Sequence, residues 1–165
     1  MDVGCGPGQF ARLCVEEGHP YVGIDFSQVA IEQGRKNGHE AIFHLVDVVK
    51  DKSLLKKGNY DTVTLIEFLE HIEEDLEVIN SIPEGKNVVF SVPKYWSKAH
   101  VRAFNTRKSV YIRYDELMEI KDISEVSLGS QQTRNINNSY NKKDRVIDYW
   151  KIYILSGIRK CNKNC

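Results

Sequence analysis

A glycine-rich stretch at the start of the chain constrains its fold more than any other feature. Residues 1–8 read MDVGCGPG, which indicates the end of a strand followed by a tight turn. Gly4 and Gly6 carry no Cβ, so the backbone there can bend sharply and approach a bound molecule closely. The helix expected at 9–17 would direct its N-terminal amide groups and its dipole toward that molecule. We therefore expect a ligand-binding turn between the first strand and the first helix.

An acidic residue stands at the end of the second expected strand, 21–25. Asp25 lies 21 residues beyond Gly4, a distance that places its carboxylate to accept hydrogen bonds from both ribose hydroxyls of a nucleoside. The dinucleotide fingerprint G-x-G-x-x-G would need a glycine at position 9, where this chain has Gln9. The spacing therefore favours another adenosyl compound and disfavours a nicotinamide oxidoreductase.

Residues 2–8 read D-x-G-x-G-x-G, which resembles the first motif of the class I S-adenosylmethionine-dependent methyltransferases, the type 11 and 12 groups included. The resemblance continues in order at 44–48, at 60–66 with its Tyr-Asp pair, and at 87–93. It implies that S-adenosylmethionine is the cofactor and S-adenosylhomocysteine the product. It also implies that Asp47, at the end of the third strand, contacts the adenine amino group.

The fold expected from this resemblance is α/β, a Rossmann-like seven-stranded methyltransferase sheet with helices on both faces and a C-terminal antiparallel hairpin. We expect residues 1–165 to form a single domain. Members of the family usually begin with one or two helices that close over the cofactor. This chain opens inside the first motif, so the resemblance predicts an N-terminally short form.

Alternating patterns of strands and helices support a parallel sheet with helices on both faces. The expected strands beyond the second are 40–48, 60–66, 87–93, 124–128 and 145–155. The expected helices are 9–17, 28–37, 70–80 and 111–120, with a short helix or turn at 51–57 and a polar loop at 130–143.

Composition excludes several classes of protein. The chain has 165 residues, of which 41% are hydrophobic and 28% charged, as is ordinary for a globular protein. No apolar run approaches the roughly 20 residues of a membrane span, and no signal peptide is recognisable. The cysteines lack paired metal spacing, so we expect reduced thiols in a cytoplasmic protein. They are Cys5, Cys14, Cys161 and Cys165.

Charge is balanced overall, with 23 basic and 23 acidic residues, but residues 1–100 are net acidic and residues 101–165 net basic. No dense basic run or aromatic-interleaved patch appears, so nucleic acid is a disfavoured partner. The expected partner is a small-molecule methyl acceptor that takes the methyl group on oxygen or nitrogen, and the chain is a candidate homodimer.

The cofactor-binding candidates lie in the glycine turn and at the ends of the second, third and fourth strands. They are Asp2, Gly4, Cys5, Gly6, Gly8, Asp25, Phe26, Ser27, Asp47, Val48, Ile66 and Glu67. Ser27 is also the expected N-cap of the helix at 28–37.

A cluster of acidic residues with a histidine follows the fourth strand. Glu67, Glu70 and His71 stand at i, i+3 and i+4, so on a helix they would share one face. Two interpretations stay open: a divalent metal site, or His71 as the catalytic general base. The E-x-x-E-H pattern resembles ubiquinone-biosynthesis O-methyltransferases and small-RNA 3′-terminal 2′-O-methyltransferases. In the small-RNA enzymes these residues are metal ligands together with a downstream histidine. The resemblance therefore makes His100 a further candidate metal ligand.

Two functional hypotheses remain from the sequence. The complete glycine motif and Asp25 favour an active methyltransferase. The missing N-terminal helices favour a truncated or non-catalytic module of the same fold that binds the cofactor weakly or not at all. Acidic residues at the start of a helix also suit its dipole without any further function.

Overall fold

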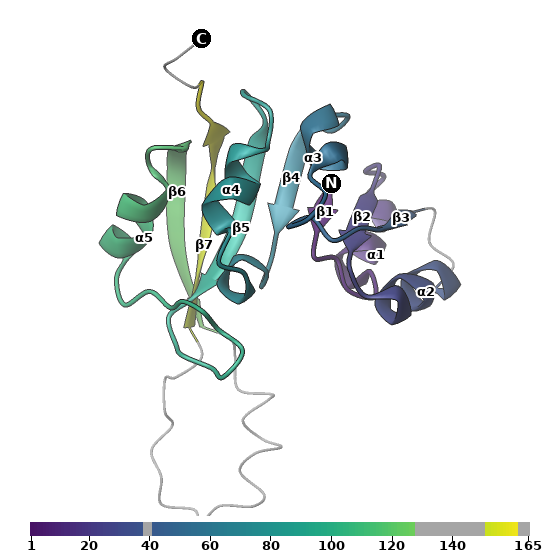
Figure 1. Ribbon diagram of the computed structural model, residues 1–165, viewed down its shortest axis with the longest axis horizontal. Helices are drawn as coiled ribbons and strands as arrows, with labels where there is room; N and C mark the ends of the chain where they lie inside the picture. Colours follow the sequence, from purple (N-terminus) through teal and green to yellow (C-terminus); the bar gives the residue numbers. More distant parts are fainter. Residues whose placement is uncertain (38–40, 128–150, 162–165) are drawn as a thin grey trace, which may run out of the picture.

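The computed structural model describes residues 1–37, 41–127 and 151–161. Its centre is one seven-stranded sheet with the order β3-β2-β1-β4-β5-β7-β6, which Figure 1 shows from one edge to the other. Strands β1 to β5 run parallel. Their bounds are Asp2–Val3, Val22–Asp25, Ile42–Leu45, Thr62–Leu65 and Asn87–Pro93. The carboxyl ends of these strands therefore meet at one edge of the sheet, where ligands bind in open α/β sheets.

Helices cover both faces of the sheet, as the sequence predicts. One buried cluster joins β1, β4, β5 and β7 to α3 (Ser53–Lys57), α4 (Asp75–Asn80) and α5 (Arg107–Tyr114). A second, smaller cluster packs α1 (Gln9–Glu16) and α2 (Gln28–Lys36) against β2 and β3. In the part of the chain described here, no helix has the length and apolar character needed to cross a membrane.

The N-cap prediction for Ser27 is confirmed, because its side-chain oxygen accepts a hydrogen bond from the amide of Ala30 at 3.3 Å. The prediction of a helix at 70–80 is wrong for the first half of that range. A single 3-10 turn, η1 (Leu69–His71), comes first, and α4 begins only at Asp75. Ile72 between them is extended, with φ −124° and ψ 141°, so the chain leaves the helical conformation there.

The C-terminal strands form the predicted antiparallel arrangement with different bounds. β6 (Met118–Ser127) and β7 (Lys151–Arg159) pair with each other, and β7 also pairs with β5. The helix expected at 111–120 ends at Tyr114, because the ladder with β7 extends back to Met118, whose side chain is fully buried. The strand expected at 124–128 therefore starts six residues earlier. The polar loop at 130–143 and residues 145–150 of the expected last strand lie outside the described residues.

Candidate functional site

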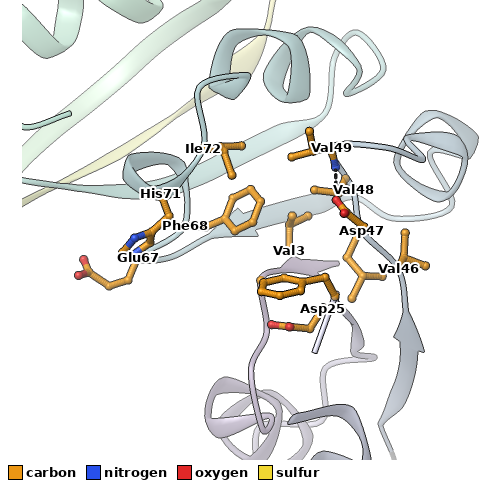
Figure 2. A pocket seen from close by; sticks show the side chains of 13 residues that line it. Val3, Asp25, Val46, Asp47, Val48, Val49, Glu67, Phe68, His71 and Ile72 are labelled. Carbon is orange, nitrogen blue, oxygen red and sulfur yellow. Dashed lines mark hydrogen bonds between the residues drawn. The ribbon is translucent and has the colours of Figure 1, made fainter. Parts of the chain in front are cut away.

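A cavity of about 590 Å³ lies at the carboxyl ends of β1, β2, β3 and β4, within the usual size range of small-molecule sites. Its lining residues are Val3, Gly4, Ile24, Asp25, Phe26, Val46, Asp47, Val48, Val49, Glu67, Phe68, His71 and Ile72. Figure 2 shows Glu67 and His71 toward one end of the cavity and Asp47 and Val49 toward the other. The walls of the cavity are therefore mostly apolar, and its few polar side chains lie apart from one another.

Packing requires glycine at two positions of the turn. Gly4 has φ 73°, and a Cβ there would lie 2.5 Å from the ring of Phe68. Gly8 has φ 79°, and a Cβ there would lie 2.6 Å from the ring of Phe43. Gly8 therefore serves the packing of α1 and α2, whereas Gly4 lets Phe68 form a wall of the cavity. Phe68 is a lining residue that the sequence reasoning did not single out.

Asp25 connects the second strand to the glycine turn. Its Oδ2 accepts a hydrogen bond from the Gly6 amide at 2.9 Å, and its Oδ1 accepts one from the Ser27 amide at 2.8 Å. An ionised carboxylate has about four lone-pair sites, so both oxygens can accept a further hydrogen bond from a ligand. The side chain is half-buried at the cavity wall. It is therefore fixed in direction and still open to a donor.

Asp47 occupies the other polar position predicted for a nucleoside. Its Oδ1 accepts from the Val49 amide at 3.1 Å, and its Oδ2 lies 2.7 Å from the Lys50 ammonium. The hydrogen bond from Lys50 is the main cause that lowers the pKa of Asp47 below its ordinary value. Asp47 therefore faces the cavity as a carboxylate, which accepts hydrogen bonds and donates none.

The predicted cofactor-binding residues divide into two sets. Those that line the cavity are Gly4, Asp25, Phe26, Asp47, Val48 and Glu67, together with the catalytic candidate His71. Those that do not line it are Asp2, Cys5, Gly6, Gly8, Ser27 and Ile66. Within the second set, Gly6 and Gly8 belong to the turn itself, whereas Asp2 supports the strand that leads into it.

Asp2 shows what such support looks like. Its buried carboxylate accepts hydrogen bonds from the Tyr21 hydroxyl at 2.6 Å and the Thr64 hydroxyl at 2.7 Å. Burial is the main cause that raises the pKa of Asp2 above its ordinary value. Burial likewise raises the pKa of the Cys5 thiol to about 12, so that thiol stays protonated. The Asp2 side chain therefore ties β1 to Thr64 of β4 and to Tyr21 just before β2, whereas the Cys5 side chain packs in the smaller buried cluster.

Glu67 does not share a helix face with Glu70 and His71, which corrects the prediction from their spacing. Glu67 has φ 50°, a left-handed conformation that ends β4 and turns the chain. The buried Ser91 hydroxyl accepts from the Glu67 amide at 2.7 Å and donates to Glu67 Oε1 at 2.9 Å. These two hydrogen bonds hold the strained turn and orient the Glu67 side chain beside the cavity.

Glu70 and His71 instead meet His100, which comes from the loop after β5. One potential ligand atom from each of the three lies within 4.8 Å of the others. Glu70 is fully buried, and neither of its carboxylate oxygens has a hydrogen-bond partner. Burial is the main cause that raises the pKa of Glu70 to about 7. His71 is half exposed and also lines the cavity.

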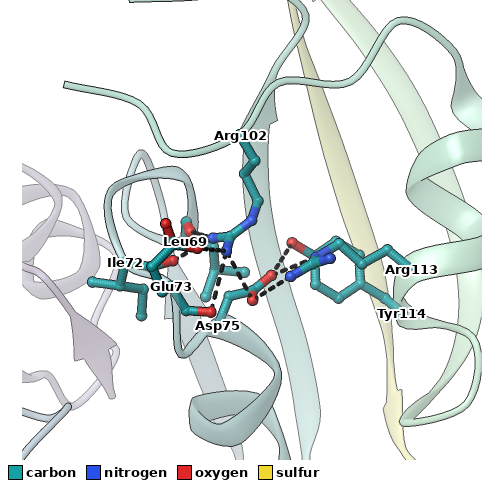
Figure 3. Close-up of polar contacts among 7 residues, drawn as sticks. All are labelled: Leu69, Ile72, Glu73, Asp75, Arg102, Arg113 and Tyr114. Carbon is teal, nitrogen blue, oxygen red and sulfur yellow. Dashed lines mark hydrogen bonds and ion pairs between the residues drawn. The ribbon is translucent and has the colours of Figure 1, made fainter. Parts of the chain in front are cut away.

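Arg102 holds the segment that carries these residues, and no motif in the sequence indicated it. Figure 3 shows its guanidinium among the carbonyls of Leu69, Ile72 and Glu73. The same guanidinium lies 3.2 Å from the buried carboxylate of Asp75. Carbonyl groups that a continuous helix would satisfy internally are thus satisfied by a side chain from a distant loop.

Comparison with known proteins agrees with this geometry. A family model described as a methyltransferase domain matches residues 1–84. The ubiquinone biosynthesis O-methyltransferase of Vibrio parahaemolyticus is 26% identical over 171 residues, covering 90% of this chain and 72% of the relative. The same enzyme of Pectobacterium carotovorum is 29% identical over 142 residues, covering 74% and 59%.

Solved structures share the fold. A methyltransferase described as SAM dependent, from Archaeoglobus fulgidus, superposes with a TM-score of 0.66 at 18% identity, covering 96% of this chain and 84% of that one. The magnesium protoporphyrin IX methyltransferase of Synechocystis, with bound SAH, also gives 0.66 at 18% identity, covering 96% and 73%.

Proposed function

The chain belongs to the methyltransferase-domain family, and we propose that it transfers a methyl group from S-adenosylmethionine to an oxygen or nitrogen of a small-molecule acceptor. One observation carries this proposal. The cavity at the carboxyl ends of the strands places two carboxylates, Asp25 and Asp47, apart on apolar walls. Such a pair of hydrogen-bond acceptors fits a nucleoside, whose hydroxyl and amino groups donate hydrogen bonds and whose base has flat apolar faces.

We assign Asp25 to the ribose hydroxyls and Asp47 to the adenine amino group. The side chains around Asp47 are Val46, Val48 and Val49, which offer an apolar surface to the base. The glycine turn with Gly4 and Gly6 would accommodate the remainder of the cofactor, because its backbone can be approached closely. The bound sulfonium supplies an already activated methyl group, so the protein has only to align it with the acceptor and remove a proton.

His71 is the proposed catalytic residue on the acceptor side of the cavity. Its Nδ1 lies 3.0 Å from the carbonyl oxygen of Ala99. A carbonyl only accepts, so Nδ1 carries the hydrogen and Nε2 presents a lone pair. That lone pair is placed to accept the proton of a hydroxyl or amino acceptor, a role that contributes about 10²–10⁴-fold in such enzymes.

The small-molecule acceptor is inferred from the relatives. The curated matches are named for ubiquinone biosynthesis, and one structural neighbour is named for magnesium protoporphyrin. The first name refers to O-methylation in the synthesis of a small organic molecule, and the second to a small organic acceptor. The assignment to the cytoplasm rests on the cysteine usage, and the homodimer remains a prediction from the sequence.

Calorimetric titration with S-adenosylhomocysteine tests the proposal. We expect saturable one-to-one binding by the wild-type chain, weakened at least tenfold by Asp25→Ala, because hydrogen bonds to a charged group contribute about 1.5–3 kcal/mol each. Glu17→Gln, an exposed acidic position outside the cavity, is the matched control and should bind as the wild type does. Absence of binding by a folded wild-type chain would favour the alternative, a non-catalytic module of this fold.

A further inference from the structure

The backbone of Glu67 is strained at the wall of the cavity. Among the residues that the structure describes, Glu67 is the one residue other than glycine with a positive φ, at 50°. Glycine takes this left-handed conformation without steric cost, whereas a glutamate does not. Strained residues persist where their surroundings hold them, and they gather at functional sites. Because Glu67 also lines the cavity, its conformation indicates a use for its side chain.

A buried hydroxyl on β5 fixes the Glu67 side chain. Ser91 is fully buried, accepts a hydrogen bond from the Glu67 amide at 2.7 Å and donates one to Glu67 Oε1 at 2.9 Å. One hydroxyl group thus holds both the strained backbone and one carboxylate oxygen. Glu67 Oε2 takes no hydrogen bond from the residues that the structure describes. The carboxylate is therefore fixed in direction, and one of its oxygens is left for a ligand.

The charged side chains around the cavity are mainly acidic. Asp25, Asp47 and Glu67 line it together with His71, and no lysine or arginine does so in the described part of the chain. Opposite charges attract more strongly in a partly closed site than in bulk water. The cavity therefore favours a ligand that carries positive charge over a neutral ligand of the same shape.

We propose that Glu67 binds the positive charge at the point of methyl transfer, and so selects S-adenosylmethionine over the product, whose sulfur is neutral. This inference rests on the proposed function, in which Asp47 contacts the base and Asp25 the ribose. The sulfur follows the 5′ carbon of the ribose, so it lies toward the other polar end of the cavity. Figure 2 shows Glu67 and His71 at that end. Ser91 is then a positioning residue that acts through Glu67.

The change of charge during the reaction gives this selection a use. As the lone pair of the acceptor bonds to the methyl carbon, the electron pair of the broken S–C bond stays on sulfur, and the acceptor proton passes to His71 Nε2. The sulfur thereby loses its positive charge and its attraction to Glu67. The product is then held less tightly than the next molecule of donor, so the Glu67 carboxylate favours product release.

Two ligands of similar shape test the inference without any turnover. S-Adenosylhomocysteine has a neutral sulfur, whereas sinefungin carries an ammonium group in that region of the molecule. Calorimetric titration of the full chain gives the ratio of their two dissociation constants, with EDTA present so that no bound cation screens the carboxylate. We expect the wild type to bind sinefungin about fivefold or more tightly than S-adenosylhomocysteine. Glu67→Gln keeps the shape of the side chain and should bind the two ligands about equally.

Two further variants act as matched controls for this ratio. Ser91→Ala releases the carboxylate without removing it, so the preference for sinefungin should fall part of the way. Asp47→Asn acts on the nucleoside that both ligands share, so it should weaken both and leave their ratio unchanged. A side chain with a purely structural role would not change the ratio.

Each outcome bears on a separate statement. Equal affinities in the wild type, or an unchanged ratio in Glu67→Gln, would overturn the inference and leave the proposed function intact. If Glu67→Gln fails to fold, Glu67→Gly decides the matter, because glycine takes the left-handed conformation freely. Binding of neither ligand by the folded wild-type chain would refute the proposed function, and this inference with it.

Discussion

At the scale of single residues, Glu70 is a costly side chain to bury. Its pKa is raised to about 7, chiefly by burial. The titratable and charged groups that act on it are Glu67, His71 and Arg102, with His100 beside it. Because the folded chain holds this proton more tightly than the unfolded chain, the contribution of Glu70 to stability is largest below about pH 4.5. It falls as the pH rises toward 7, by on the order of 3 kcal/mol.

We therefore predict that Glu70→Gln removes much of this loss of stability between pH 5 and pH 8. The free energy of unfolding, measured by urea denaturation in the presence of a chelator, should decrease less with pH in the variant than in the wild type. Glu116→Gln makes the same change at an exposed position and should keep the wild-type slope. Parallel slopes for Glu70→Gln and the wild type would mean that the carboxylate is not desolvated in solution.

Part of the site could be predicted at this scale and part could not. Asp25 and Asp47 follow from the spacing of strand ends, because parallel strands bring their carboxyl ends together. His100 was named beside Glu70 and His71 only through the resemblance to the small-RNA methyltransferases, and the structure brings the three together. Their convergence depends on the path of the loop after β5, which no local pattern specifies. The i, i+4 rule failed for Glu67 because the left-handed residue and the Ser91 hydrogen bonds turn the chain before any helix begins.

At the scale of elements, the turn between β4 and α4 depends on one largely buried arginine. Arg102 donates to carbonyls of Leu69, Ile72 and Glu73 and pairs with Asp75, the first residue of α4. Asp75 is held from the other side by Arg113, at 2.7 and 2.8 Å, and by the Tyr114 hydroxyl at 2.9 Å. The network therefore ties the turn, α4 and α5 together. This external support explains why a helical pattern at 70–80 yields a helix only from Asp75.

We predict that Arg102→Lys destabilises the chain by about 2–4 kcal/mol, because one ammonium group cannot serve the carbonyls and the carboxylate together and buried acceptors lose their donor. Arg107→Lys, at the exposed start of α5, should cost less than about 0.5 kcal/mol. Urea denaturation of both variants measures the difference. Equal free energies of unfolding for the two variants would show that water or Arg113 takes over the contacts of Arg102.

At the scale of the whole molecule, the sequence predicted the order and direction of the strands well because its motifs mark strand ends in sequence. It predicted the C-terminal hairpin less accurately. Residues 118–120 carry a pattern compatible with a helix, and only the ladder with β7 decides that they form a strand. Pairing across long stretches of chain depends on the tertiary register, which local propensity does not determine.

The continuous sheet leads to a prediction about ligand binding and global stability. S-adenosylhomocysteine that binds only the folded chain should stabilise it by about 2.7 kcal/mol at a hundredfold excess over its Kd. For a chain of this size that corresponds to a rise of roughly 5–10 °C in Tm. Scanning calorimetry should show one transition that moves as a whole, since the strands at the cavity and the C-terminal strands belong to one sheet.

NADH at the same concentration should leave Tm unchanged, because the glycine spacing at 4–8 is not that of a dinucleotide site. A rise in Tm with NADH and none with S-adenosylhomocysteine would contradict the assignment of the cavity. Two separate transitions would contradict the coupling between the two halves of the sheet.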